Sequence, residues 1–465
     1  MRNVRVLVLI VFALVSAPTA AQTIEPEGGR MPGLPDPSLA TSLAPALADP
    51  GGVRRALAPA GITYAINYIG EVFGNPSGGI RRGTIYAGLL EVAVDANLET
   101  LAGWKGLTFH ASGYQIHGDG LTAQYIGNLN PISNIEATPS TRLFDVWLEQ
   151  SLLDDKLSVR FGQLRVDYGG EFLSIAPGAL YINTNPGWPS FTAVNLPSGG
   201  VSYPLGALGA RVKFEPSDDL TLLFAAFNDD PAGPCDGDPQ GCNAHGLNFR
   251  LRDEPFLIAE AQFKYALGNG AGRLPGIIKI GAFEDLGTFD DQHFDDTGLS
   301  LADPNSSGTP RRIQSDRAVY GIIEQKLASA GATDEEKGVW FFTRVTGMPS
   351  DRNLIDFYAE GGITFSGVVP GRPGDEFGVA MSYSHISNAA AALDRDTVAF
   401  GTDTPIRDYE VVLELTYKAE IVPGWSLQPD FQYIWNPGGT VPGEDDPSVA
   451  VPNAAVFGLR TTNNY

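Results

Sequence analysis

The amino-acid sequence predicts an all-β protein, a transmembrane antiparallel β-barrel of about 16 strands with short periplasmic turns and long extracellular loops. Three observations support this fold class. The chain begins with an export signal, no later apolar run is long enough for a membrane-spanning helix, and short segments of alternating apolar and polar residues recur through most of its 465 residues.

The export signal occupies the first residues of the chain. Arg2 and Arg5 precede an apolar run from Val6 to Val15, and small residues follow up to Ala21. This order is typical of a secretory signal peptide that is cleaved near Ala20 or Ala21. The apolar run spans only about half of the roughly 20 residues that a membrane-spanning helix needs. We therefore expect residues 1–21 to be removed on export.

Beyond the signal, no stretch approaches the roughly 18 consecutive apolar residues that indicate a membrane-spanning helix. The mean hydropathy of the chain is −0.05, close to neutral. A β-barrel is compatible with both facts, because its strands alternate lipid-facing apolar residues with lumen-facing polar residues.

The rest of the chain divides into two parts. Residues 22–60 are rich in Pro, Gly and Ala and are expected to form a flexible lead-in with a short helix around Val53 to Leu57. After Gly61, Gly and Pro clusters recur at short intervals, which favours a meander of strands and turns over separate globular units. Residues 61–465 are therefore predicted to form a single barrel.

Two segments show the alternation most clearly. In residues 86–94 and 409–417, every second residue is tyrosine, glycine or aliphatic, while the other face carries charges such as Glu91 and Glu414. An apolar exterior and a wet lumen require such a pattern. Tyrosines at the strand ends fit an aromatic girdle at the membrane interface.

The same pattern predicts sixteen strands along the chain, an even number, as in bacterial single-chain barrels. Their expected first residues are Ile62, Thr84, Leu107, Leu143, Leu157, Leu208, Leu220, Phe256, Ile277, Ala318, Val339, Ile355, Phe377, Tyr409, Trp425 and Ala454. Connections at residues 154–156, 215–219 and 420–424 are tight, whereas those on the other side are mostly long. The longest runs from about Tyr168 to Gly206 and is the third of the outer series.

The formal net charge is −23, and it becomes −25 once the two arginines of the signal are removed. This acidity argues against nucleic acid as a partner. Much of it lies in expected loops, at residues 285–296 and 444–446. These carboxylates either solvate the loops or contribute to cation preference in a channel, as would inward carboxylates such as Glu91, Glu149, Glu360 and Glu414.

Cys235 and Cys242 are the only cysteines, and they lie close together in a loop rich in Gly, Pro and Asp. Export places them where thiols oxidise, so we expect a local disulfide, with free thiols as the alternative. No His or Cys cluster has the spacing of a metal site, and we expect neither metal nor cofactor.

We expect no catalytic residues. The sequence contains neither a Gly-x-Ser-x-Gly nor a His-Glu-x-x-His motif, and its five His residues are scattered. A substrate-gated active transporter would need a plug domain and about 22 strands, for which the chain is too short. A water-soluble β-rich binding protein or adhesin is the remaining alternative class.

Ten short segments, in order along residues 61–462, resemble the OprB-type carbohydrate-selective porins of Gram-negative bacteria. They are 147–150 (WLEQ), 161–163 (FGQ), 185–189 (NPGWP), 196–200 (LPSGG), 227–233 (FNDDPAG), 246–250 (GLNFR), 349–354 (PSDRNL), 370–373 (PGRP), 414–417 (ELTY) and 428–433 (QPDFQY). The chain ends in Asn463-Asn464-Tyr465, whereas such barrels commonly end in Phe.

This resemblance implies passive diffusion of mono- or small oligosaccharides across the bacterial outer membrane. It also implies contact with outer-membrane lipid and lipopolysaccharide, and with the barrel-assembly machinery through the C-terminal strand. A general-diffusion or cation-preferring porin is the alternative. Many porins fold their third outer loop into the lumen, which directs attention to the long connection that ends at Gly206.

A sugar channel needs flat aromatic faces for the apolar side of a pyranose and charged or amide groups for its hydroxyls. The aromatic candidates of the long loop are Tyr181, Trp188 and Phe191, and the charged candidates are Glu149, Arg160, Arg165, Asp167, Arg344 and Glu360. The alternatives are that Trp188 only anchors the loop by packing, and that the charges are ordinary lumen residues that keep the pore wet.

Overall fold

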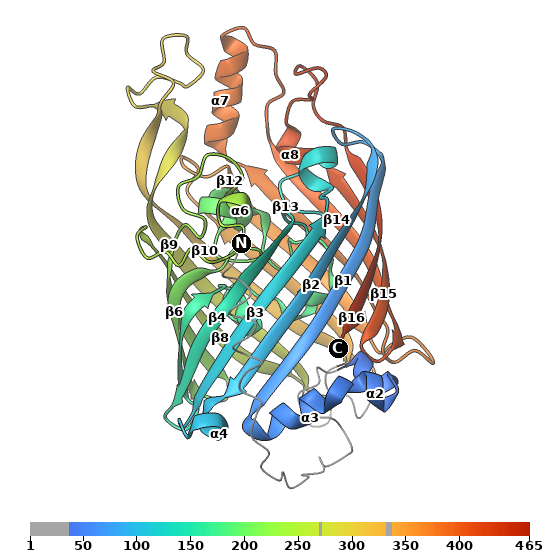
Figure 1. Ribbon diagram of the computed structural model, residues 1–465. Coiled ribbons are helices and arrows are strands. Elements are labelled where there is room, and N and C mark those ends of the chain that lie inside the picture. Colours follow the sequence, from blue (N-terminus) through green and yellow to red (C-terminus); the bar gives the residue numbers. More distant parts are fainter. Residues whose placement is uncertain (1–36, 269–271, 332–336) are drawn as a thin grey trace, which may run out of the picture.

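The computed structural model describes residues 37–268, 272–331 and 337–465. In this part of the chain, sixteen antiparallel strands close into one barrel, in which β1 pairs with β16 and each other strand pairs with its neighbours in the sequence (Figure 1). Closure leaves no open edge, as a barrel in a membrane requires. The expected signal, residues 1–21, lies outside the described residues.

The strands are β1 Ile62–Ser77, β2 Gly83–Asn97, β3 Leu107–Gly118, β4 Ser140–Leu152, β5 Leu157–Leu164, β6 Ala207–Ser217, β7 Leu220–Asn228, β8 Pro255–Leu267, β9 Leu274–Asp295, β10 Pro310–Ser329, β11 Gly338–Gly347, β12 Ile355–Ser366, β13 Glu376–Ile386, β14 Tyr409–Val422, β15 Trp425–Trp435 and β16 Ala454–Asn464. The helices are α2 Pro45–Ala48, α3 Val53–Leu57, α4 Leu98–Ala102, α5 Ser190–Asn195, α6 Pro239–Cys242, α7 Asn388–Ala399 and α8 Pro437–Thr440.

The sixteen-strand barrel predicted from the sequence is confirmed, with one substantial difference. Strand β10 begins at Pro310, eight residues before the expected Ala318, and the expected acidic loop at residues 285–296 is mostly part of β9. The two strands form a long hairpin that rises above the barrel rim (Figure 1). No face of the hairpin meets lipid there, so carboxylates are tolerated and the apolar alternation that marks a membrane strand is lost.

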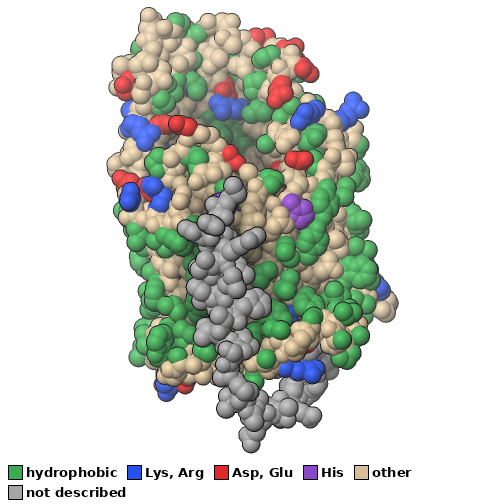
Figure 2. Space-filling model, in the orientation of Figure 1, with side chains coloured by type: hydrophobic (Ala, Val, Ile, Leu, Met, Phe, Trp, Pro, Cys, Tyr) green, Lys and Arg blue, Asp and Glu red, His purple; other side chains and the backbone are tan. Residues whose placement is uncertain are grey.

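The outward faces of the strands are apolar. Tyr86 and Val92 on β2 and Leu415 on β14 are exposed on the outside, while Glu410 and Glu414 are buried inside the barrel. Apolar side chains cover much of the wall in the view of Figure 2, and charged side chains gather towards its two ends. This distribution matches a wall that crosses a lipid bilayer.

The N-terminal segment packs beneath the inner end of the barrel, where α2 and α3 lie (Figure 1). The Tyr465 hydroxyl donates to the carbonyls of Leu47 and Ala48 at 2.7 and 3.0 Å. The Arg54 guanidinium stacks over the rings of Tyr64 and Tyr465, at 4.0 and 5.0 Å from their centroids. These contacts join the described part of the lead-in, residues 37–60, to β1 and to Tyr465, which directly follows β16.

The third outer connection, residues 165–206, is the longest, and it folds inside the barrel. Its apolar side chains form one cluster with inward residues of the wall, including Ala225 on β7, Ile258 on β8, Phe342 on β11 and Tyr358 on β12. The inner wall is therefore apolar and packed on this side, although the alternation predicts a polar lumen all round. Inward apolar residues are stable here because the loop, and not water, covers them.

The apolar exterior can be tested at Ile280, which is 63% exposed and lies six residues after β9 begins at Leu274. An arginine near the bilayer midplane costs about 2–4 kcal/mol in an outer-membrane barrel. Ile280→Arg should lower the free energy of unfolding by about that amount, as measured by denaturant titration of protein folded in lipid vesicles. Val398→Arg, at an exposed apolar position on α7 outside the barrel, should change it little. Equal effects of the two substitutions on the free energy of unfolding would contradict the assignment of Ile280 to a lipid-facing wall.

Candidate functional site

The loop of residues 165–206 is held in place by carboxylates of the inner wall. Glu260 on β8 accepts from the Leu173 amide at 3.0 Å, Glu324 on β10 from the Ala176 amide at 3.0 Å, and Glu414 on β14 from the Ile182 and Asn183 amides at 2.6 and 3.2 Å. Buried amides need such acceptors when water is excluded. Glu414, an inward carboxylate as expected, is thus engaged by the loop and not available to a passing ion.

Two aromatic candidates from the sequence are packing anchors of this loop. Tyr181 is 1% exposed, and its hydroxyl donates to the carbonyl of Ile363 at 3.0 Å. Phe191 is fully buried, with its ring centroid 5.3 Å from that of Tyr358. Neither ring has a free face in this structure, so the expectation that Tyr181 and Phe191 stack on a sugar does not fit their positions.

Arg344 and Glu360 lie behind the same loop. They are register partners on β11 and β12, and their ion pair measures 3.0 Å between Nη2 and Oε1. The Arg344 Nη2 group also donates to the carbonyl of Pro186 at 3.1 Å, and the Tyr358 hydroxyl donates to Glu360 at 2.9 Å. Both charged side chains are buried. The sequence places them correctly inside the barrel, but the loop covers them, so they do not line an open channel.

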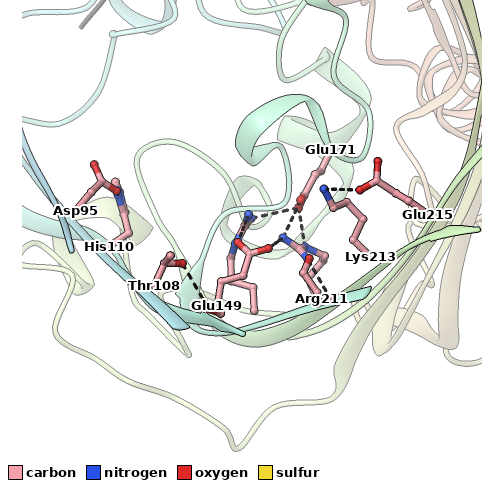
Figure 3. Close-up of polar contacts among 10 residues, drawn as sticks. Asp95, Thr108, His110, Glu149, Glu171, Arg211, Lys213 and Glu215 are labelled. Carbon is pink, nitrogen blue, oxygen red and sulfur yellow. Dashed lines mark hydrogen bonds and ion pairs between the residues drawn. The ribbon is translucent and has the colours of Figure 1, made fainter. Parts of the chain in front are cut away.

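Glu149 lies close to Glu171 and Arg211 (Figure 3), and Arg160 belongs to the same compact group of four charges. Glu149 on β4 pairs with Arg160 on β5 and with Arg211 on β6, both at 2.8 Å. Glu171, from the folded-in loop, pairs with the same two arginines at 3.2 and 2.9 Å. We call these four residues the charge cluster. Its two arginines and two carboxylates compensate one another.

Strand register assembles the wall side of the charge cluster. Glu149 is the partner of Arg160 across β4 and β5, and Arg160 is the partner of Arg211 across β5 and β6. The sequence analysis missed Arg211 and Glu171. Arg211 sits on the same face of its strand as Lys213, so alternation could have identified it, whereas Glu171 depends on the path of the loop and has no local signal.

Arg165 and Asp167 lie at the start of the folded-in loop and not in the barrel wall, because β5 ends at Leu164. The Arg165 Nε atom is 3.5 Å from the Asp145 carboxylate, and its guanidinium lies 5.1 Å from the centroid of the Tyr168 ring. Arg165 and Asp167 are both partly exposed. They therefore lie near the charge cluster without belonging to it.

An aromatic group that the sequence analysis missed adjoins the charge cluster. The rings of Trp147 and Tyr168 meet edge to face at 5.3 Å, and His110 stacks on Trp147 at 4.9 Å. Arg160 lies over both Trp147 and Tyr168, at 4.6 and 4.5 Å. The Asp95 carboxylate is 2.7 Å from His110 and its side chain is 54% exposed. The inner ends of β2 to β6 therefore keep accessible polar groups, whereas further out the inward residues of β1 to β4, such as Leu89 and Ile116, are buried in a second apolar cluster.

Trp188 lies nearer the outer end of the barrel, at a cavity of about 510 Å³ between the outer loops. Its side chain is 6% exposed, and its indole N–H donates to the carbonyl of Gly199 at 2.8 Å. A Cβ atom at Gly200 would lie 2.8 Å from the ring, so glycine is needed there. Trp188 is thus mainly packed into the loop and presents only part of its ring to the cavity.

The outer loop that carries α6 also borders this cavity. Cys235 and Cys242 form a disulfide in it. In the described ranges, no group of three or more His, Cys, Asp or Glu side chains could hold a metal ion. No helix in these same ranges is both long and apolar enough to cross a membrane.

Glu136, in the outer loop between β3 and β4, is the most perturbed carboxyl of the cavity wall. It accepts from the amide and the hydroxyl of Thr122 at 3.0 and 2.9 Å. Burial raises the pKa of Glu136 from 4.5 to about 7 and outweighs these hydrogen bonds, which favour the charged form. The nearby Glu71 carboxylate raises it further.

Comparison with known proteins gives a consistent result. A family model described as carbohydrate-selective porin, OprB family, matches residues 81–465. The chain is 24% identical over 435 residues to Porin B of Pseudomonas aeruginosa strain PAO1, covering 89% of this chain and 90% of that protein. It is 22% identical over 432 residues to a putative porin, QuiX, of Acinetobacter baylyi strain ADP1, covering 86% and 90%.

Among solved structures, the high-pH structure of Pseudomonas putida OprB superposes with a TM-score of 0.76. The sequences are 21% identical, and the match covers 90% of this chain and 97% of that one. At this identity the similarity establishes the fold.

The pKa of Glu136 predicts a pH-dependent outer loop. Because the folded-state pKa lies above the ordinary value, the loop is most stable below about pH 4.5 and loses stability as the pH rises through about 7. Hydrogen exchange of residues 122–126, corrected for the intrinsic rate, should therefore be faster at pH 8 than at pH 5, by about tenfold or more. Glu136→Gln should abolish this difference in exchange rate between pH 5 and pH 8. If the variant keeps the difference, a group other than Glu136 causes the pH dependence.

Proposed function

The chain belongs to the OprB family of carbohydrate-selective porins, and on that premise we propose that small sugars cross its barrel on the side bordered by β1 to β6, past the charge cluster. As a member of this family, the protein is an outer-membrane channel for carbohydrates. The folded-in loop packs its apolar side chains mainly against the wall from β7 to β13, and its amides bind carboxylates of β8, β10 and β14. It meets the wall of β5 and β6 through Glu171, at the charge cluster.

The observation that carries this proposal is the compensation of charge at Glu149, Arg160, Glu171 and Arg211. A sugar hydroxyl both donates and accepts hydrogen bonds. Glu149, whose side chain is 19% exposed, offers such a hydroxyl a carboxylate acceptor beside the largely buried guanidinium groups of Arg160 and Arg211. Because the four charges sum to zero, the cluster has little net attraction for a single ion. Such a wall favours a neutral, hydroxyl-rich solute.

Aromatic rings next to the charge cluster support the same proposal. Tyr168 is partly exposed and packs with Trp147 under the Arg160 guanidinium. A pyranose presents C–H groups on its faces, and an aromatic ring can cover them while the hydroxyls bind the charges, which is worth on the order of 1 kcal/mol. We assign this role to Tyr168, and place Arg165 and Asp167 beside it at the start of the loop.

The solutes we propose are mono- and small oligosaccharides, moving by passive diffusion without catalysis. The apolar outer wall supports contact with outer-membrane lipid and lipopolysaccharide. The C-terminal strand β16, which is followed by the aromatic residue Tyr465, is proposed to engage the barrel-assembly machinery before Tyr465 is covered by the lead-in.

Transport by purified protein in liposomes tests the proposed function. Glucose should enter faster than a non-sugar solute of similar size and faster than a large oligosaccharide, because a selective channel recognises the hydroxyl pattern as well as the size. Sorting by size alone would indicate a general-diffusion pore. Passage of small cations without sugars would indicate that Glu91 and Asp95 dominate and that the channel is cation-preferring.

The charge cluster is tested by Glu171→Gln, which changes its net charge from zero to +1. We expect the ratio of cation to anion permeability, from reversal potentials in a salt gradient, to fall about two- to fourfold, because one unit charge a few ångströms from the path acts in a watery lumen. The effect should shrink at high salt. Glu444→Gln, in an exposed outer loop, is the matched control. The same ratio in both variants would place the ion path elsewhere.

A further inference from the structure

The cavity above the charge cluster has an acceptor-rich wall. It measures about 510 Å³ and lies among the outer connections that follow β3, β5 and β7. Hydroxyl and amide groups line it together with the aromatic residues Trp188 and Tyr203. Its size and mixed wall suit a small polar solute with some apolar surface.

The charged residues that line this cavity are all acidic. They are Asp119, Glu136 and Asp238, and no lysine or arginine is among the lining residues in the described chain. Three arginines lie behind the wall with their guanidinium groups engaged, among them Arg460, which donates to the Ser133 hydroxyl and the Asn134 side-chain oxygen at 3.0 and 2.8 Å. Arg81 donates to the Gln124 carbonyl at 2.8 Å, and Arg142 donates to the carbonyls of Pro204 and Gln240 at 3.1 and 3.2 Å. A solute in the cavity therefore meets carboxylates first.

Buried acceptors without partners lie in the same wall. Asn130 is 0% exposed, and its amide nitrogen donates to Asn185 and to the carbonyl of Trp188, whereas its Oδ1 atom has no hydrogen-bond partner in the described structure. The hydroxyl oxygen of Ser202, 2% exposed, is likewise without a partner. Unsatisfied buried acceptors are costly, so both atoms call for a donor such as a sugar hydroxyl or a protonated amine.

The acidic side of the cavity is braced. The disulfide between Cys235 and Cys242 closes the short loop that carries Asp238 and Gln240. The Asp238 carboxylate accepts from the Gln240 amide at 2.9 Å and from the Thr138 hydroxyl, and the Gln240 side chain accepts from the Thr138 amide at 2.7 Å. The loop is thereby tied to the connection between β3 and β4. Asp238 is held at the cavity and does not swing freely in water.

We propose that this cavity is an outer docking site for neutral and amino sugars and that it disfavours sugar acids and sugar phosphates. The inference rests on the proposed function, because a docking site for solutes matters only if they pass on to the lumen. The acceptors bind hydroxyl and ammonium donors, while Asp119 and Asp238 repel anionic groups. Selection by charge thus takes place outside the compensated charge cluster.

Three sugars that share one ring test this proposal: glucose, protonated glucosamine and glucuronate. Each is added in turn to the outer or the inner side of single channels in a planar bilayer, at low salt, and its block of the ion current is measured. From the outer side, glucosamine and glucose should enter more often than glucuronate. Each charged carboxylate of the cavity should contribute a factor of about two to three to this difference in entry rate. From the inner side, the three rates should differ less.

Asp119 is the residue to vary, because it is exposed at the cavity and its substitution leaves the braced loop intact. Asp119→Asn should lower the ratio of the glucose entry rate to the glucuronate entry rate about twofold, and Asp119→Lys should lower this ratio further. Both effects should appear only when the solute is added to the outer side. Asp445→Asn removes the same charge from another exposed outer loop and should leave this ratio of entry rates unchanged.

The outcomes separate this inference from the proposed function. If all three sugars pass but Asp119 variants behave like Asp445→Asn, the docking site is refuted and the carbohydrate channel stands. Equal rates for glucose and glucuronate from the outer side of the unmodified protein would also refute it. If no sugar enters from either side while ions pass, the proposed function itself fails.

Discussion

The loop of residues 165–206 brings backbone amides into the barrel, and each amide shielded from water needs an acceptor. The wall supplies acceptors on three strands, with Glu260, Glu324 and Glu414 each bonded to loop amides. This pairing fixes the path of the loop along one side of the lumen. The apolar side chains follow that path, so Tyr181 and Phe191 pack against β11 and β12.

The position of the loop makes the lumen asymmetric. One side is packed and apolar, and the inner end of the other side keeps polar side chains such as Asp95 accessible. The loop also completes the polar side, because Glu171 neutralises the arginines that β5 and β6 contribute. The path that we propose therefore leads from an acidic outer cavity to a compensated cluster, two environments with different preferences for charge.

The barrel itself could be predicted because each strand must present an apolar face to lipid, a local requirement that shows as alternation. Strands such as β1 and β14 begin where expected, at Ile62 and Tyr409. The prediction was wrong at β10, which begins at Pro310, because the hairpin above the rim meets no lipid and carries no such alternation. Acidic residues in that hairpin resemble a loop in the sequence although the backbone is paired.

By itself the sequence determined the fold class, the strand order, the third outer loop as the longest, and the inward positions of Glu149, Arg160, Arg344 and Glu360, because these follow from short-range pattern. Only the tertiary structure decided which inward charges are covered and which stay partly exposed in the lumen. Glu149, Arg160, Arg344 and Glu360 are alike in the sequence. The loop buries Arg344 and Glu360, whereas Glu149 and Arg160 belong to the charge cluster, in which 19% of the Glu149 side chain stays exposed. That difference depends on strand register and on the path of a distant loop, and neither is written in local alternation.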